Sequence, residues 1–145
     1  MTRTVDDGDR RAEVTTVLNE ITDPCSRGAN LPIGMVDMGL VEHLEVANGH
    51  VRLRLIPTYP GCLFIGFFEV EARTRLRKLT WCEDVSVEQV SAAEGVWTED
   101  RMSPAARARL EDRRARLRRA SVTEPSRSPA RARPGTSPDP PLSGR

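Results

Sequence analysis

Residues 41–56 carry the sequence VEHLEVANGHVRLRLI, in which an Asn-Gly pair separates two alternating segments. Asn-Gly suits a tight two-residue turn because both positions accept positive φ angles. On either side, apolar residues alternate with charged ones, which is typical of strands with one buried and one exposed face. The stretch therefore predicts an antiparallel hairpin formed by residues 41–46 and 51–56.

The segments around this hairpin predict two helices and a third strand. Residues 10–22 have a helical period, and their apolar stripe comprises Val14, Val17, Leu18 and Ile21. Asp23-Pro24 is expected to end this helix. Residues 63–78 have the same period, with a stripe of Phe64, Phe68, Ala72 and Leu76. Residues 85–90 alternate as a strand does. The order helix, strand, strand, helix, strand predicts an α+β fold: a small mixed sheet with helices on one face.

Composition divides the chain into four parts. Residues 1–9 are polar and are expected to be flexible, residues 10–103 form the α+β domain, and residues 25–34 within it are expected to be a loop. Ser103-Pro104 starts a basic C-terminal helix, residues 104–120. Residues 121–145 are rich in Pro, Ser and Arg and are expected to be a disordered tail. Residues 1–100 hold 10 Lys+Arg and 17 Asp+Glu, a net charge of −7, whereas residues 101–145 hold 12 and 4, a net charge of +8.

Several classes of protein are disfavoured by the sequence. The three cysteines, Cys25, Cys62 and Cys82, form no close pair, which favours reduced thiols in a cytoplasm over a disulfide framework. No apolar leader or run of about 20 apolar residues is present, so a cytoplasmic protein without a membrane span is expected. Phosphate-binding and dinucleotide-binding glycine motifs are absent as well.

Cys62 is the main candidate for chemistry. It ends the segment TYPGC, residues 58–62, between a predicted strand and a predicted helix. Backbone N–H groups at a helix start favour an anion, and a cysteine there tends to react or bind metal as a thiolate. A buried turn cysteine without chemistry is the equally weighted alternative from position alone.

Three segments together resemble the SufT/PaaD-like iron–sulfur (metal–sulfur) cluster assembly family. They are Asp23-Pro24, VDMGLV at residues 36–41 and TYPGC at residues 58–62, followed by Trp97 and Met102-Ser103. The resemblance covers about residues 14–110. It implies a cytosolic domain used in late maturation of iron–sulfur proteins, with Cys62 as the functional thiol. It also implies that Asp23 belongs to an acidic loop near that thiol and that Thr58 shapes the turn.

Two positions depart from the family pattern. Cys25 stands where the family commonly has Glu, and Leu63 stands where it often has Pro. Cys25 is therefore either a second metal ligand or a small loop residue. Asp37 either lines the same pocket or holds a turn before Gly39, where a side chain would obstruct the backbone.

The resulting hypothesis is a non-catalytic assembly factor that transiently holds an iron–sulfur cluster or iron. Cys62 and Cys25 are its candidate ligands for metal or cluster, and Asp23, Asp37 and Thr58 are candidates for shaping the site. The expected partners are client apo-metalloproteins, cluster scaffold proteins or both. A homodimer, a client or a small thiol would supply the missing ligands. The seven arginines between residues 107 and 119 are not interleaved with aromatic residues, which disfavours binding of this segment to nucleic acid.

Two alternatives stay open. The first is an accessory maturation protein that docks on a metal-dependent, multicomponent oxygenase, as the PaaD resemblance suggests. A thiol redox enzyme with Cys62 as nucleophile is the second, although no C-x-x-C pair and no nearby histidine base support it.

Overall fold

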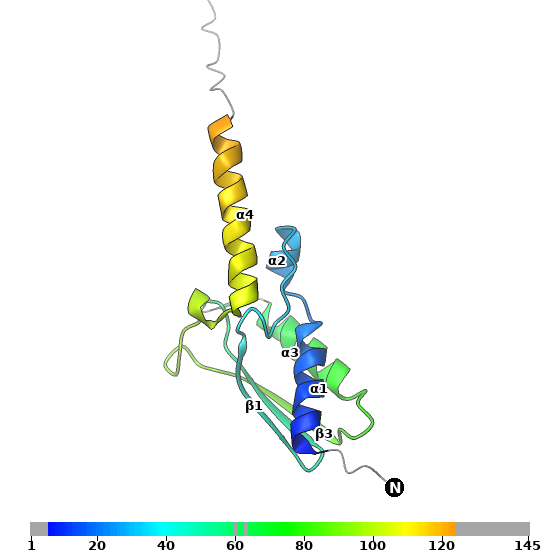
Figure 1. Ribbon diagram of the computed structural model, residues 1–145. Helices are drawn as coiled ribbons and strands as arrows, with labels where there is room; N and C mark the ends of the chain where they lie inside the picture. The colour runs from blue at the N-terminus through cyan, green and yellow to red at the C-terminus, as the bar shows by residue number, and fades with distance from the viewer. Residues whose placement is uncertain (1–5, 60, 63, 124–145) are drawn as a thin grey trace, which may run out of the picture.

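The computed structural model describes residues 6–59, 61, 62 and 64–123, and it confirms the α+β prediction (Figure 1). Its elements in chain order are α1 (Asp7–Asn19), α2 (Pro24–Gly28), β1 (Val41–Ala47), β2 (His50–Leu55), α3 (Ile65–Leu76), β3 (Asp84–Gln89), a 3-10 turn (Glu99–Arg101) and α4 (Pro104–Thr123). None of the helices in these ranges is long and apolar enough to cross a membrane.

The three strands form a mixed sheet in the order β1-β2-β3. β1 and β2 pair antiparallel, and Asn48 and Gly49 between them have φ angles of 49° and 79°. Both angles are positive, as the predicted Asn-Gly turn requires. β2 and β3 pair in parallel, and such a pair needs a long crossover connection. Helix α3 provides that crossover, so the hairpin and the helix together determine the sheet order.

One face of the sheet packs against α1 and α3 (Figure 1). Val51, Leu53 and Leu55 point from β2 into the core, and each is at most 1% exposed. From the helices, the buried residues that face them are Val14 and Leu18 of α1 and Phe68, Ala72 and Leu76 of α3. The predicted apolar stripes therefore form the core, apart from Phe64.

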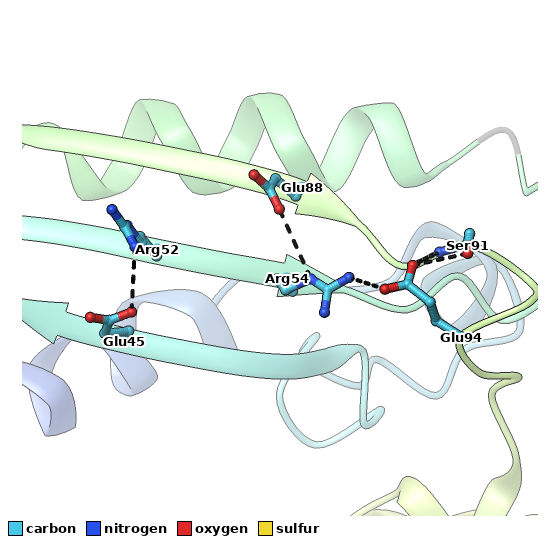
Figure 2. A network of polar contacts seen from close by, with 6 residues as sticks. All are labelled: Glu45, Arg52, Arg54, Glu88, Ser91 and Glu94. Atoms are coloured by element: carbon cyan, nitrogen blue, oxygen red, sulfur yellow. Dashed lines mark hydrogen bonds and ion pairs between the residues drawn. The ribbon is translucent and has the colours of Figure 1, made fainter.

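The opposite face of the sheet is polar. Figure 2 shows its ion pairs in front of the strands: Arg52 with Glu45 at 4.0 Å, and Arg54 with Glu88 at 4.0 Å and Glu94 at 2.6 Å. The hydrogen bond from Arg54, helped by those from Ser91, lowers the pKa of Glu94 to about 2. Exposed pairs of this kind add little stability. They keep this face charged and hydrated.

Several element bounds differ from the sequence-based expectation. Helix α1 already begins at Asp7, within the segment expected to be flexible, because Asp7 and Asp9 suit the positive end of a helix dipole. Part of the loop expected at residues 25–34 is the short helix α2. Helix α4 continues to Thr123, past the expected end at residue 120. The rest of the expected tail, residues 124–145, lies outside the described residues, as do residues 1–5.

Candidate functional site

Asp23 starts helix α2 and so places Cys25 in it. Its side chain is buried at 7% exposure, and its Oδ2 accepts a 2.7 Å hydrogen bond from the backbone N–H of Ser26. Such a carboxylate is a strong N-cap. Helix α1 has already ended at Asn19, so the expected helix-ending role of Asp23-Pro24 is wrong, and Pro24 occupies the first turn of α2, where proline is tolerated.

The α2 segment is also tied to the loop that follows it. Asp23 N donates to Ile33 O at 2.9 Å, and Ile33 N donates to the Ser26 hydroxyl at 3.0 Å. That hydroxyl in turn donates to Asp23 O at 2.8 Å. These bonds close the segment into a small, fully paired unit. The position of Cys25 is therefore set by backbone and side-chain hydrogen bonds, not by its own packing.

Cys62 lies in the turn that joins β2 to α3. Its backbone N–H donates to Tyr59 O at 3.2 Å, and Gly61 before it has a φ of 81°. The Thr58 hydroxyl donates a long, weak hydrogen bond to Cys62 Sγ at 3.9 Å. Helix α3 begins at Ile65, so the half-buried thiol precedes the helix start by three residues. Thr58 thus contacts the sulfur of Cys62, and its role in shaping the turn stays a prediction.

A pocket of about 170 Å³ brings four of the predicted site residues together. Its polar walls are Asp23, Cys25, Thr58 and Cys62. Cys25 and Cys62 are 37 positions apart in the chain, and no local pattern could show that they share a pocket. At about 30 Å³ for each water of the liquid, this volume corresponds to about six waters, which is enough for a small inorganic group but not for a large organic ligand.

Asp37, the fifth predicted site residue, is engaged elsewhere. Its Oδ2 accepts from Asn19 Nδ2 at 2.9 Å, and its N–H donates to Asn19 Oδ1 at 3.0 Å. It is not among the residues that line the pocket. Asp37 therefore holds the end of α1 against the segment before Gly39, which is the structural role that the sequence left open for it.

The remaining walls of the pocket are apolar and were not singled out as site residues. They are Leu40, Pro57, Phe64, Ile65, Phe68 and Trp97. Phe64 was expected in the core stripe of α3, but it lies before the first helical residue and is 39% exposed. Trp97 is held in place by a 2.8 Å hydrogen bond from Nε1 to Met38 O. Apolar walls limit water access, which strengthens the interaction of a thiolate with a cation.

The ionisable groups that line the pocket are all acidic. Although Cys25 is exposed, partial desolvation by its neighbours raises the pKa of its thiol, and Asp23 and Cys62 raise it further. None of the described residues that line the pocket is cationic. A bound cation would supply the positive charge that these groups lack. Within residues 6–59, 61, 62 and 64–123, however, no three His, Cys, Asp or Glu side chains are placed to hold a metal ion together.

Cys82 lies apart from this pocket. It is half-buried after α3, and its Sγ donates to Asp84 O at 3.7 Å. Burial raises the pKa of its thiol. Cys82 therefore serves as a natural control for the other two cysteines.

The fold and pocket define a small α+β domain with a two-thiol pocket at the beginning of a helix. The chain belongs to the iron–sulfur cluster assembly protein family, whose sequence model matches residues 11–89. This match covers both α2 and the turn that carries Cys62. It confirms the assembly family that the three motifs indicated.

Individual proteins are similar to this chain in sequence or in fold. An uncharacterized protein of Methanocaldococcus jannaschii, MJ1129, is 31% identical over 78 residues, which are 53% of this chain and 77% of that protein. A domain of unknown function, DUF59, from Bacillus anthracis superposes with a TM-score of 0.60 at 21% identity, over 70% of this chain and 91% of that one. The hypothetical protein TM0487 from Thermotoga maritima gives 0.55 at 25% identity, over 69% and 92%.

Replacing Asp23 separates its two candidate roles. Asp23→Ala removes the cap of α2 and is expected to lower the free energy of unfolding by about 1–2 kcal/mol in urea titration. Asp23→Asn keeps a capping oxygen but removes the charge, so it should retain most of that stability. If the charge of Asp23 also attracts a metal cation to the pocket, Asp23→Asn weakens iron binding even though it retains the stability. Equal loss of stability in both variants would contradict the capping role.

Proposed function

We propose that this chain is an iron–sulfur cluster assembly factor that holds iron or a small cluster at Cys62 and Cys25 and passes it on. The observation that carries the proposal is the single pocket shared by these two thiols and Asp23. Thiolates are the ligands that iron–sulfur clusters prefer. The cluster or iron is cargo here, and the protein performs no turnover chemistry on it.

The two thiols have unequal positions in this proposal. Cys62 is half-buried, in contact with the Thr58 hydroxyl, and acts as the permanent anchor. Cys25 is exposed at the pocket mouth and acts as the second ligand. An exposed ligand can be replaced by a thiolate of an incoming protein, which suits a factor whose cargo must leave. All three cysteines are free thiols, which fits a reducing cytoplasm.

The pocket supplies two of the four thiolates that a typical cluster requires. The other two must come from outside this chain. A second copy would supply the same pair, whereas a client apo-protein or a scaffold protein would supply its own. In both cases the incoming ligands would approach over Cys25, because it is the more exposed of the two thiols.

Anaerobic reconstitution with ferrous iron and sulfide tests the role of Cys25. We expect the wild-type chain to develop visible sulfur-to-iron absorption and the Cys25→Ser variant to bind about 10–100-fold more weakly, since one of two ligands is lost. Cys82→Ser is the matched control, because it removes a half-buried thiol outside the pocket. Equal absorption in wild type and Cys25→Ser would reduce the site to one thiol, and no absorption in wild type would overturn the proposal.

A further inference from the structure

Helix α4 carries an excess of arginine that the fold does not use. Between Pro104 and Thr123 it has seven arginines against two carboxylates, so its net charge is +5. Figure 1 shows the helix projecting away from the sheet, with α2 beside its lower part. Its inner side is buried only near its start, at Ala106. Most of this charge therefore faces solvent.

A groove runs between the end of α2 and α4. It measures about 400 Å³ and is lined by Ala29, Asn30, Leu31, Arg109, Asp112, Arg113 and Arg116. The three arginines follow each other at spacings of four and three residues, which places them on one face of the helix. Their guanidinium groups thus converge on one concave surface.

Two of these arginines have no carboxylate partner within the chain's described parts. Arg116 pairs with Asp112 at 2.6 Å, and outside the groove Arg107 pairs with Asp100 and Arg114 with Glu99 and Glu111. No such ion pair involves Arg109 or Arg113 among residues 6–59, 61, 62 and 64–123. The groove therefore presents two unneutralised guanidinium groups.

The groove adjoins the thiol pocket. Cys25 lines the pocket, and Ala29, four residues later and just past the end of α2, lines the groove. Four helical residues span about 6 Å. A partner held in the groove would therefore reach Cys25, the side from which a cluster or iron would be exchanged.

We propose that the α2–α4 groove docks an acidic peptide segment of the protein that exchanges cargo with this chain; this rests on the function proposed above. Guanidinium groups bind carboxylates in a bidentate way, and Arg109 and Arg113 are placed for two such contacts. Leu31 also lines the groove and offers an apolar contact. The lack of aromatic residues among the groove's lining residues favours a carboxylate peptide over a nucleic acid, whose bases stack on aromatic side chains.

The test uses the full chain and a fluorescein-labelled ten-residue oligoglutamate peptide, with binding measured by fluorescence anisotropy at low ionic strength. The double variant Arg109→Glu/Arg113→Glu is expected to weaken binding at least about tenfold. The control Arg77→Glu/Lys78→Glu changes the net charge equally at the exposed end of α3 and should change binding less than about twofold. Arg109→Gln/Arg113→Gln, which cannot repel the peptide, should lie between them.

Three outcomes would overturn the docking site: no binding by wild type, equal weakening in the groove and control variants, or a single-stranded ten-nucleotide DNA that binds more tightly than the peptide and depends on the same arginines. Circular dichroism of each variant verifies the helix content. Iron–sulfide reconstitution should stay at the wild-type level in the groove variants, and Cys62→Ser should retain peptide binding. These two measurements distinguish a failure of the docking proposal from a failure of the proposed thiol site.

Discussion

Cys62→Ser is expected to abolish iron and cluster binding while the fold stays intact. The thiol is half-buried in the pocket and donates no structural hydrogen bond among the described residues, so a hydroxyl fits in its place with little effect on unfolding. A serine hydroxyl is a far poorer ligand for iron–sulfur clusters than a thiolate. The apparent affinity for iron, measured from the visible absorption after anaerobic reconstitution, should fall at least about 100-fold. This loss is larger than the one expected for Cys25→Ser.

Thr58→Val is the matched control for this prediction. It keeps the shape of the side chain and removes the hydroxyl that contacts Cys62 Sγ. Because a weak contact of this kind orients the sulfur without ligating the cargo, binding should fall by only a few-fold. A Cys62→Ser variant that reconstitutes like wild type would refute the assignment of Cys62 as the anchor. A variant that loses its circular dichroism would instead show that the sulfur has a structural role.

Gly39→Ala is expected to have the largest effect on stability. Gly39 has a φ of 77°, and an added Cβ would lie 2.2 Å from Arg101 O and 2.5 Å from Arg101 C. Both contacts are to backbone, so the 3-10 turn that precedes α4 would have to move. Backbone strain and the steric clash together should lower the free energy of unfolding by about 3–5 kcal/mol. Urea unfolding followed by circular dichroism measures the loss.

Gly61→Ala separates the two causes. Gly61 has a φ of 81°, nearly the same as that of Gly39, but among the described residues nothing lies within 4 Å of an added Cβ. It should therefore show the conformational strain alone, about 1 kcal/mol. Equal losses in the two variants would mean that the close approach of Arg101 to Gly39 does not matter. That close approach joins residues 62 positions apart, and the sequence indicated it only as a glycine that a side chain would obstruct.

Local patterns predicted the elements well because their causes are local. The Asn48-Gly49 turn follows from the φ angles that these residues accept, and the stripe of α1 follows from helical period. Helix starts were less predictable. Phe64 continued the apolar period of α3 but lies before its first residue, and Asp23-Pro24 looked like a helix end yet begins α2. An Asp-Pro pair suits both positions, so only the hydrogen bonds of the folded chain decide between them.

The candidate site shows the same division. The sequence by itself determined that Cys62 lies between a strand and a helix, and it predicted Cys25 as a second candidate ligand. Only the tertiary structure decided that the two thiols share a pocket with Asp23, that Asp37 is bound to Asn19 instead, and that two arginines of α4 converge beside α2. Turn and helix preferences depend on residues a few positions apart. The contacts named above join residues far apart in the chain, so they depend on how α2 and α4 pack in the folded protein.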